Sequence, residues 1–184
     1  MKEISDLTAD VLIVGSEGAG SLAAVEAADA GLDVLLVTKE FHGRGGVTVM
    51  AEYSCAAATG DADPEDNPDV HFRDTLIGGY YLANQELVEL CCELGAESVR
   101  KMDTWGCPWD KTPDGRFHQT KMPGYTYRRA LHCGHATGIE IMKSLVKHVR
   151  KKANIRVLNE TILTDLFARD GQVGGALAIR IPTG

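Results

Sequence analysis

The stretch VLIVGSEGAGSLAA, Val11 to Ala24, decides the fold of this chain. A short apolar run from Ala9 to Gly15 predicts a buried parallel strand, and the small and apolar residues of 18–30 predict a packed helix. A second apolar run, DVLLVTK at 33–39, predicts the next strand. Strand, helix and strand within about 30 residues form a βαβ unit with a right-handed crossover. The chain is therefore predicted to have an α/β fold with a parallel central sheet.

The loop inside this stretch meets two of the three glycine requirements of a dinucleotide site. The first glycine makes the tight turn and the third lets the helix pack closely on the strand, and Gly15 and Gly20 supply these two. Glu17 stands where the second glycine would let backbone approach a pyrophosphate, while Gly18 adds a glycine. A carboxylate about 4 Å from an anion would be repelled by about 1 kcal/mol in water. We therefore expect Glu17 to turn outward to solvent, with its backbone N–H left facing the phosphate.

The end of the second predicted strand departs from the usual NAD pattern. An acid normally stands there to bind the ribose hydroxyls. Here the strand ends in Thr38 and Lys39, and a threonine hydroxyl can hydrogen-bond a ribose instead. Two alternatives stay open from these residues: an NAD(P)-dependent reductase domain, and a non-catalytic fragment that holds a nucleotide or nothing.

The composition excludes several classes of partner. The net charge of −7 argues against nucleic acid and anionic lipid surfaces. No apolar run approaches the about 20 residues that span a bilayer, so we expect no direct membrane insertion. The polar, acidic start predicts no signal peptide. The five cysteines are odd in number and lack CxxC spacing, which favours free thiols in the cytoplasm and no zinc site.

The remaining chain alternates surface loops with helix and strand patterns. DADPEDNPD at 61–69 is predicted to be an acidic, proline-punctuated surface loop. Thr137 and Glu140 match a capping box in front of an amphipathic helix. Further helices are expected over 68–77 and 84–102, a small hairpin is expected around 113–115, and closing strands are expected from residue 154 with a tight turn at Asp170-Gly171.

Six stretches in this order carry a family resemblance: DVLIVGSEGAG, VTKEFHGRGGVTVMA, HFRDTLIGGYYLANQELV, WGCPWDKTPDGRFHQ, YRRALHCGHATG and ETILTDLFARDGQVGGALAI. Together they resemble the flavoprotein subunits of fumarate reductase and succinate dehydrogenase, with L-aspartate oxidase as a relative. The resemblance covers nearly the whole chain. It implies one Rossmann-type FAD-binding domain over 1–184, with a parallel central sheet and a small antiparallel β element.

The resemblance also implies where FAD would be held. The pyrophosphate would lie on Gly15, Ser16, Gly18, Ala19 and Gly20, with the backbone N–H of Glu17. Thr38 and Lys39 would contact the ribose side. The flavin and its phosphates would be lined by Arg44, Gly45, Gly46 and Thr48, and Leu163 would offer its backbone to the adenine.

One departure from the family pattern concerns the bond to the flavin. In the covalent members, a histidine of the flavin loop is attached to FAD. The matching position here is Gly46, and His42 lies four residues too early. The resemblance therefore implies FAD that is bound without a covalent link.

The implied activity is hydride transfer between the flavin and a small dicarboxylate-type substrate. The family's substrate-binding machinery and a further sheet strand come after the part of the pattern matched here. We therefore name no catalytic residue, and we expect the chain to be the front part of a longer enzyme and inactive alone. An iron–sulfur or other electron-transfer subunit is the implied partner, which would make a cytoplasmic protein peripheral to the membrane.

Overall fold

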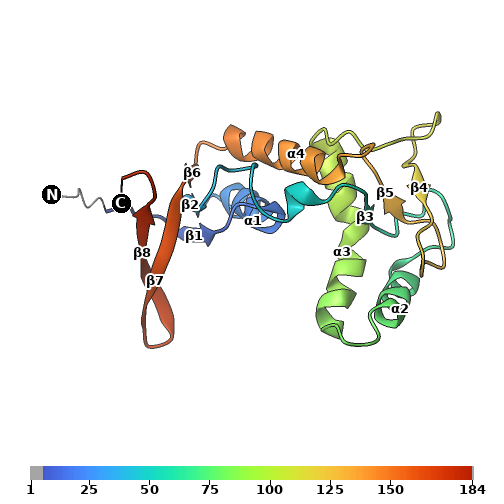
Figure 1. Ribbon diagram of the computed structural model, residues 1–184, viewed down its shortest axis with the longest axis horizontal. Helices are drawn as coiled ribbons and strands as arrows, with labels where there is room; N and C mark the ends of the chain where they lie inside the picture. The colour runs from blue at the N-terminus through green and yellow to red at the C-terminus, as the bar shows by residue number, and fades with distance from the viewer. Residues whose placement is uncertain (1–5, 184) are drawn as a thin grey trace. The chain divides into compact units, whose positions relative to one another are not determined.

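The computed structural model describes residues 6–183, which divide into two compact units (Figure 1). Unit 1 combines the chain up to Met50 with the chain from Leu145 onward, and unit 2 is Ala51–Ser144. The long helix α4 (Thr137–Lys151) begins in unit 2 and ends in unit 1. Each unit has its own sheet and its own helices.

Unit 1 contains the predicted βαβ unit. Its elements are β1 (Val11–Val14), α1 (Gly18–Asp29), β2 (Val34–Val37), the short 3-10 helix η1 (Thr48–Met50), β6 (Ile155–Leu158), β7 (Thr161–Arg169) and β8 (Gln172–Arg180). The first sheet has the order β1-β2-β6, and both pairings are parallel. The predicted α/β fold with a parallel sheet is therefore confirmed, and α1 packs against β1 and β2.

The central strand explains why this sheet forms. All four residues of β2 are buried, because the strand is paired on both edges and is covered by α1. The buried face of α1 consists of small residues, Ser21, Ala24, Val25 and Ala28, which let helix and sheet approach closely. A continuous apolar run is typical of a strand in a buried parallel sheet.

The hairpin β7–β8 extends from the end of this sheet. The backbone N–H of Thr161 donates to the carbonyl of Thr38 at 2.9 Å, which joins the start of β7 to the end of β2. The hairpin turns at Asp170 and Gly171, whose φ angles are +52° and +78°. Two successive positive φ angles match the right-handed twist of hairpin strands, and the predicted turn is confirmed.

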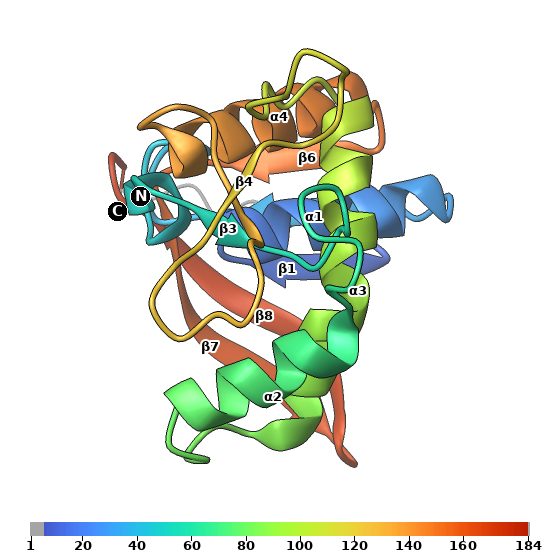
Figure 2. The same cartoon turned by 90° about the vertical axis from the view of Figure 1, so that its right-hand side faces the viewer.

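Unit 2 is built from helices around a very small antiparallel sheet. Its elements are β3 (Cys55–Ala56), α2 (Pro68–Gly78), α3 (Gln85–Thr104), β4 (Gln119–Thr120) and β5 (Ala130–Leu131). The sheet order is β3-β5-β4, and α2 packs beside α3 (Figure 2). The core cluster consists of Ala57, Val99, Cys107, Trp109, Phe117, Leu131 and Cys133.

One local prediction in unit 2 is wrong. The helix begins at Thr137 as expected, but the hydrogen bonds that Thr137 and Glu140 make are not those of a capping box. The hydroxyl of Thr137 donates to the carbonyl of Tyr53 at 2.7 Å and accepts from the N–H of Cys133 at 3.1 Å. The N–H of Glu140 donates to the carbonyl of Ala136 instead. The Thr137 hydroxyl is engaged by the distant Tyr53 and by the nearby Cys133, and the N–H that it would have to cap is bonded to Ala136.

Within residues 6–183, helices that are both long and apolar enough to cross a bilayer are absent.

Candidate dinucleotide-binding site

The phosphate loop follows β1 at the carboxyl edge of the parallel sheet. Because Val14 pairs with Val37, the next residues, Gly15 and Thr38, leave the sheet side by side. Gly15 has φ +95°, a conformation that favours glycine, and its N–H donates to the carbonyl of Val37 at 2.8 Å. Ligands of open α/β sheets bind beyond the carboxyl ends of the strands, where these residues lie.

Gly20 permits the close approach of helix and loop. A Cβ atom at this position would lie 1.8 Å from the carbonyl oxygen of Gly15, which belongs to the backbone and has no side-chain freedom to move away. The third glycine of a dinucleotide loop is required for this kind of contact. Both outer glycines therefore have the geometry that a phosphate-binding turn needs.

The expectation that Glu17 turns outward to solvent is wrong. Its Oε2 accepts hydrogen bonds from the N–H groups of Val47, at 2.6 Å, and Thr48, at 3.3 Å. Glu17 is also the N-cap residue of α1, yet its side chain makes no capping hydrogen bond. The carboxylate is half-buried against the second glycine-rich loop, because charged acceptors make strong bonds with backbone N–H groups.

The loop at 44–48 is joined to the phosphate loop by further contacts. The N–H of Gly18 donates to Oγ1 of Thr48 at 3.2 Å. Gly46 has φ +87°, and a Cβ there would lie 1.9 Å from Cδ of Glu17. Three hydrogen bonds therefore connect the two glycine-rich loops, and Gly46 leaves the room in which the Glu17 side chain lies.

His42 supports the phosphate loop through Ser21 of α1. Its Nε2 lies 2.9 Å from Oγ of Ser21, which donates to the carbonyl of Ser16 at 2.8 Å, so Oγ accepts from the histidine. The backbone N–H of His42 donates to Oδ1 of Asn159 at 2.9 Å. Burial, and to a smaller extent Arg150, holds the pKa of His42 below its ordinary 6.5. Sequence reasoning missed this support, although a buried serine among the alanines of α1 was a signal for it.

The other predicted site residues occupy three places in unit 1. Thr38 is buried at the end of β2, and its N–H donates to the carbonyl of Leu158 at 2.9 Å. Lys39 and Arg44 are exposed, and the guanidinium of Arg44 lies 6.0 Å from the ring centre of Phe41. Leu163 is half-buried in β7 and pairs with Ala178. The hydrogen bonds above thus join the 15–20 loop to Val47 and Thr48, and Gly46 lies beside the Glu17 side chain. The remaining positions lie on other segments of unit 1.

This arrangement fits a dinucleotide. The N-terminal N–H groups of an α-helix carry partial positive charge, and those of α1 receive no capping bond from Glu17. A pyrophosphate can use such groups as hydrogen-bond donors. The Glu17 carboxylate is engaged by Val47 and Thr48, which spreads its negative charge over two donors.

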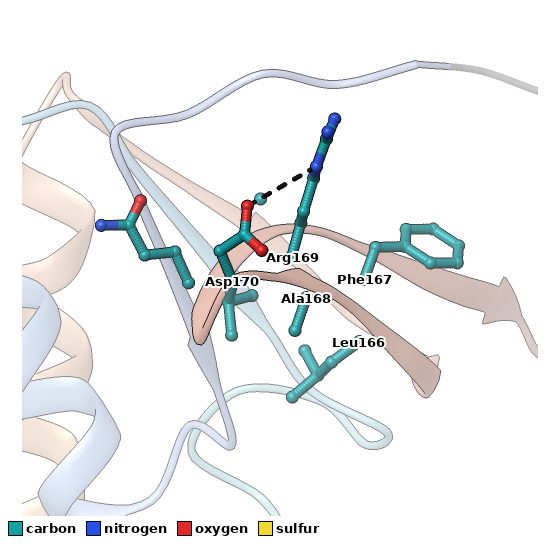
Figure 3. A pocket seen from close by; sticks show the side chains of 8 residues that line it. Leu166, Phe167, Ala168, Arg169 and Asp170 are labelled. Carbon is teal, nitrogen blue, oxygen red and sulfur yellow. Dashed lines mark ion pairs between the residues drawn. The ribbon is translucent and has the colours of Figure 1, made fainter.

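Two other features do not extend this site. An open concavity lies at the tip of the β7–β8 hairpin, where Arg169 and Asp170 form an exposed ion pair at 3.7 Å (Figure 3). None of its lining residues, which fall within 166–174, belongs to the predicted FAD site. In the part of the chain that the structure describes, His, Cys, Asp and Glu side chains form no group suited to a metal ion.

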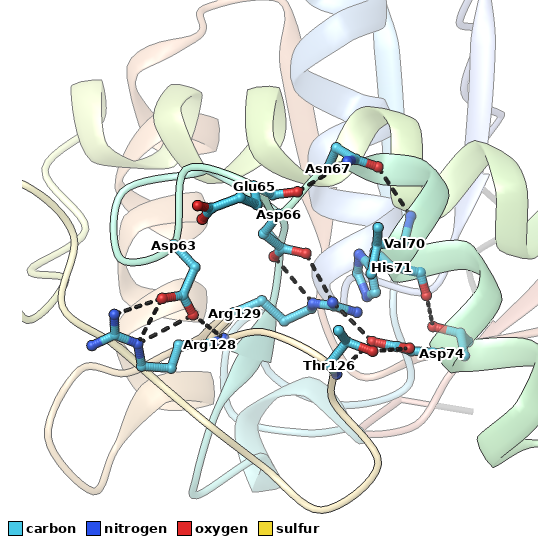
Figure 4. A network of polar contacts seen from close by, with 12 residues as sticks. Asp63, Glu65, Asp66, Asn67, Val70, His71, Asp74, Thr126, Arg128 and Arg129 are labelled. Atoms are coloured by element: carbon cyan, nitrogen blue, oxygen red, sulfur yellow. Dashed lines mark hydrogen bonds and ion pairs between the residues drawn. The ribbon is translucent and has the colours of Figure 1, made fainter.

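Unit 2 contains a buried ionic network (Figure 4). The side chain of Arg129 is fully buried, and its Nε and Nη2 donate to the two carboxylate oxygens of Asp66 at 3.1 and 2.8 Å. Nη2 also lies 2.9 Å from Oδ2 of Asp74. The backbone N–H and the hydroxyl of Thr126 each donate to Asp74 at 2.7 Å. The network joins Asp66 of the 61–69 loop to Asp74 of α2 and to Arg129, the residue before β5.

The residues of 61–69 are exposed or half-buried except Asp66, but the prediction of an acidic surface loop does not include the contacts of its carboxylates. Asp66 is only 6% exposed, while Asp63 pairs with Arg128 at 2.6 Å and Asp61 pairs with Arg100 at 3.0 Å. Three arginines neutralise three of its carboxylates, so the loop is held against the unit. The sequence shows acids in one segment and arginines in others, but it does not show that they meet.

The network shifts the pKa values of its members. Burial raises the pKa of Asp66 despite the neighbouring Arg129. Burial also opposes the ionisation of Asp74, but the hydrogen bonds from Thr126 and the charge of Arg129 outweigh it and lower its pKa. Burial is the main cause that lowers the pKa of His71 to about 4, with Arg129 adding to it. His71 is therefore a neutral side chain near neutral pH.

The chain is similar in sequence to known flavoproteins. The family described as FAD binding domain matches residues 10–183. A fumarate reductase (CoM/CoB) chain of Methanothermobacter marburgensis is 37% identical over 172 residues, which are 94% of this chain and 31% of that protein. A fumarate reductase flavoprotein subunit of Serratia is 33% identical over 178 residues, which are 96% of this chain and 29% of that protein.

The chain is also similar to solved structures of flavoprotein complexes. A chain of the Mycobacterium smegmatis Sdh1 complex in the apo form matches with a TM-score of 0.88 and 37% identity over 92% of this chain and 30% of its own length. A chain of the E. coli quinol fumarate reductase matches with a TM-score of 0.86 and 31% identity over 94% of this chain and 29% of its own length. The chain spans about 30% of the length of these relatives.

Proposed function

The chain belongs to the family of FAD-binding domains, and on this premise we propose that it forms the FAD cradle of an oxidoreductase of the fumarate reductase and succinate dehydrogenase type. The observation that carries the proposal is the phosphate loop. Gly15 and Gly20 have the required geometry at the carboxyl edge of a parallel sheet, and the N-terminus of α1 is not capped by Glu17. Both units are assigned to one domain over 1–184.

The proposed contacts fall on four segments of unit 1. The backbone of the 15–20 loop holds the pyrophosphate, and Thr38 with Lys39 faces the ribose. The second loop, with Arg44, Gly45, Gly46 and Thr48, lines the flavin side, and the backbone of Leu163 faces the adenine. FAD supplies the hydride chemistry when bound. The chain's own residues hold and orient the cofactor, and none of them is assigned a catalytic role.

FAD is proposed to be held without a covalent bond. Gly46 stands where the covalent members carry their histidine, and it has no side chain that could be attached. The measurement is acid precipitation of the loaded protein, which is expected to leave the yellow colour in the supernatant. Colour that stays in the pellet would contradict the proposal.

The whole protein is proposed to transfer hydride between flavin and a small dicarboxylate-type substrate. Relatives named fumarate reductase flavoprotein subunits support the reaction. Similarity to a chain of the Sdh1 complex supports a partner that carries iron–sulfur clusters or transfers electrons in another way. Such an enzyme would be cytoplasmic and peripheral to the membrane through its partners.

The direct test is a calorimetric titration of the chain with FAD and, separately, with NAD. We expect micromolar or tighter binding of FAD and at least about tenfold weaker binding of NAD, because Thr38 replaces the ribose-binding acid. A tighter complex with NAD would contradict the assignment and favour a nicotinamide-dependent reductase.

A matched pair of alanine variants locates the site. Gly20→Ala places a Cβ against the carbonyl of Gly15, and we expect it to weaken FAD binding by at least about a hundredfold through the displaced loop. Gly174→Ala is the control, because a Cβ on Gly174 meets no atom within 4 Å. Equal FAD affinity in the two variants would show that the 15–20 loop does not hold the cofactor.

A further inference from the structure

The side chain of Glu17 ties the two glycine-rich loops of unit 1 together. We propose that Glu17 is a positioning residue that assembles the FAD cradle before the cofactor arrives, by clamping the 44–48 loop onto the phosphate loop. The clamp requires a glycine at position 46, because the Glu17 side chain lies where a Cβ of residue 46 would be. The inference rests on the proposed function, since it assigns a role within the same site.

The clamp consists of one carboxylate oxygen and two backbone donors. Oε2 of Glu17 accepts from Val47 N–H at 2.6 Å and from Thr48 N–H at 3.3 Å. The hydroxyl of Thr48 in turn accepts from Gly18 N–H at 3.2 Å, so the phosphate loop holds the second loop at neighbouring points. An ionised acceptor strengthens such bonds relative to a neutral one.

The second loop depends on these polar contacts for its position. Residues 44–50 include no buried side chain, and Val47 is 78% exposed. Burial of apolar side chains therefore does little to fix the loop. If the loop is already ordered before FAD binds, binding does not have to order it and the entropy cost of binding is smaller. Preorganisation increases affinity in this way. Removing the clamp should therefore weaken FAD binding although the carboxylate carries the same sign of charge as the cofactor.

Gly46 is matched to the clamp for two reasons. Its φ of +87° strains any other residue, and a Cβ would lie 1.9 Å from Cδ and 2.1 Å from Oε1 of Glu17. The flexible glutamate side chain would have to leave, and the N–H groups of Val47 and Thr48 would lose their acceptor. Gly46→Ala should therefore release the same two groups as Glu17→Ala.

The test compares hydrogen exchange with FAD affinity. Amide exchange at Val47 and Thr48 is measured in the FAD-free chain for the wild type, Glu17→Ala, Glu17→Gln, Gly46→Ala and the double variant Glu17→Ala/Gly46→Ala. FAD dissociation constants are measured by calorimetry for the same proteins. Asp165→Ala is the control, because it removes one negative charge from an exposed position on β7 in the same unit.

The expected pattern is specific to a clamp. Glu17→Ala and Gly46→Ala each accelerate exchange at both amides and weaken FAD binding by at least about tenfold. The double variant exchanges no faster at these amides than Gly46→Ala alone, because the carboxylate has already been displaced. Glu17→Gln keeps an acceptor oxygen and recovers a large part of the affinity. Asp165→Ala behaves as the wild type.

Other outcomes overturn the proposal. Unchanged exchange in Glu17→Ala would show that the carboxylate does not hold the loop. Faster exchange with unchanged or tighter FAD binding would show that the clamp does not assemble the cradle. Additive effects of the two substitutions on exchange would show that Gly46 does not act by leaving room for the Glu17 side chain. If the wild type bound no FAD, the proposed function would fail and so would the clamp's role toward FAD, while exchange would still decide whether Glu17 holds the loop.

Discussion

The helices of the two units begin in different ways. In unit 2, Asn67 caps α2 and Asn84 caps α3, since their Oδ1 atoms accept from the N–H groups three residues later at 3.0 and 3.2 Å. In unit 1, the N-cap residue of α1 is Glu17, whose carboxylate bonds to another loop and makes no capping bond. A helix end that its own cap does not satisfy can serve an anion. This difference is what the proposed FAD site requires of α1 and does not require of α2 and α3.

The units also differ in the charges they bury. Among the residues that the structure describes, the buried polar side chains of unit 1 are the hydroxyl groups of Ser16, Ser21, Thr38 and Thr161. Unit 2 buries Arg129 with Asp66 and Asp74. In the described part of unit 1, buried ions that could compete with a phosphate are therefore absent, whereas unit 2 buries ions that must stay paired.

The largest expected effect breaks the ionic network. Arg129→Met leaves Asp66 and Asp74 buried without their cation, and removing one partner of a buried pair costs about 3–5 kcal/mol. We expect this loss in the free energy of unfolding measured with urea near neutral pH.

The matched control is Arg100→Ala, because the side chain of Arg100 is 54% exposed in its pair with Asp61. Exposed pairs contribute at most about 1 kcal/mol. Equal losses of unfolding free energy in the two variants would show that the buried Arg129 pairs contribute no more to stability than the exposed Arg100 pair.

A smaller effect concerns pH, and it too is confined to unit 2. The pKa of His71 is lowered from 6.5 to about 4 in the folded chain, mainly by burial. The folded chain favours neutral His71, whereas the unfolded chain protonates it below about pH 6.5. The contribution of His71 to folding stability is therefore complete above about pH 6.5 and is lost as the pH falls through about 4. Between about pH 7.5 and about pH 5, His71 should account for a loss of about 2 kcal/mol.

His71→Asn should remove this part of the pH difference when urea unfolding is measured at both pH values. The pKa of Asp66 is raised and that of Asp74 is lowered within the network, and both side chains are kept in His71→Asn, so the comparison with the wild type isolates the contribution of His71. His118→Asn is the control, because His118 is exposed. An unchanged pH difference in His71→Asn would show that His71 is not held neutral by burial.

The sequence predicts unit 1 better than unit 2 because of the distances between partners along the chain. Gly15 and Gly20 lie five residues apart, and backbone geometry alone determines what each must be. Arg129 and Asp66 are 63 residues apart along the chain, and no local sequence pattern predicts their contact. The contact between the Glu17 carboxylate and Val47 is not predictable from the sequence for the same reason, because Val47 lies 30 residues further on. The capping-box prediction failed because Thr137 bonds to Tyr53, 84 residues away.

The smallest expected effect returns to the helix ends. Asn67→Ala removes the acceptor of the Val70 N–H and should cost about 1 kcal/mol of unfolding free energy, the usual value of an N-cap. The substitution of Glu17 by alanine removes no capping bond, so any stability that it costs must come from Val47 and Thr48. Urea unfolding without FAD, with hydrogen exchange of the first turn of each helix, separates the two. An N-cap side chain bonds the N–H of the second or third helical residue, here Ala19 or Gly20, whereas the N–H of Gly18 bonds Thr48 and would be released with the 44–48 loop. Faster exchange at Ala19 or Gly20 after Glu17→Ala would mean that Glu17 does cap its helix, and the contrast between the units would then disappear.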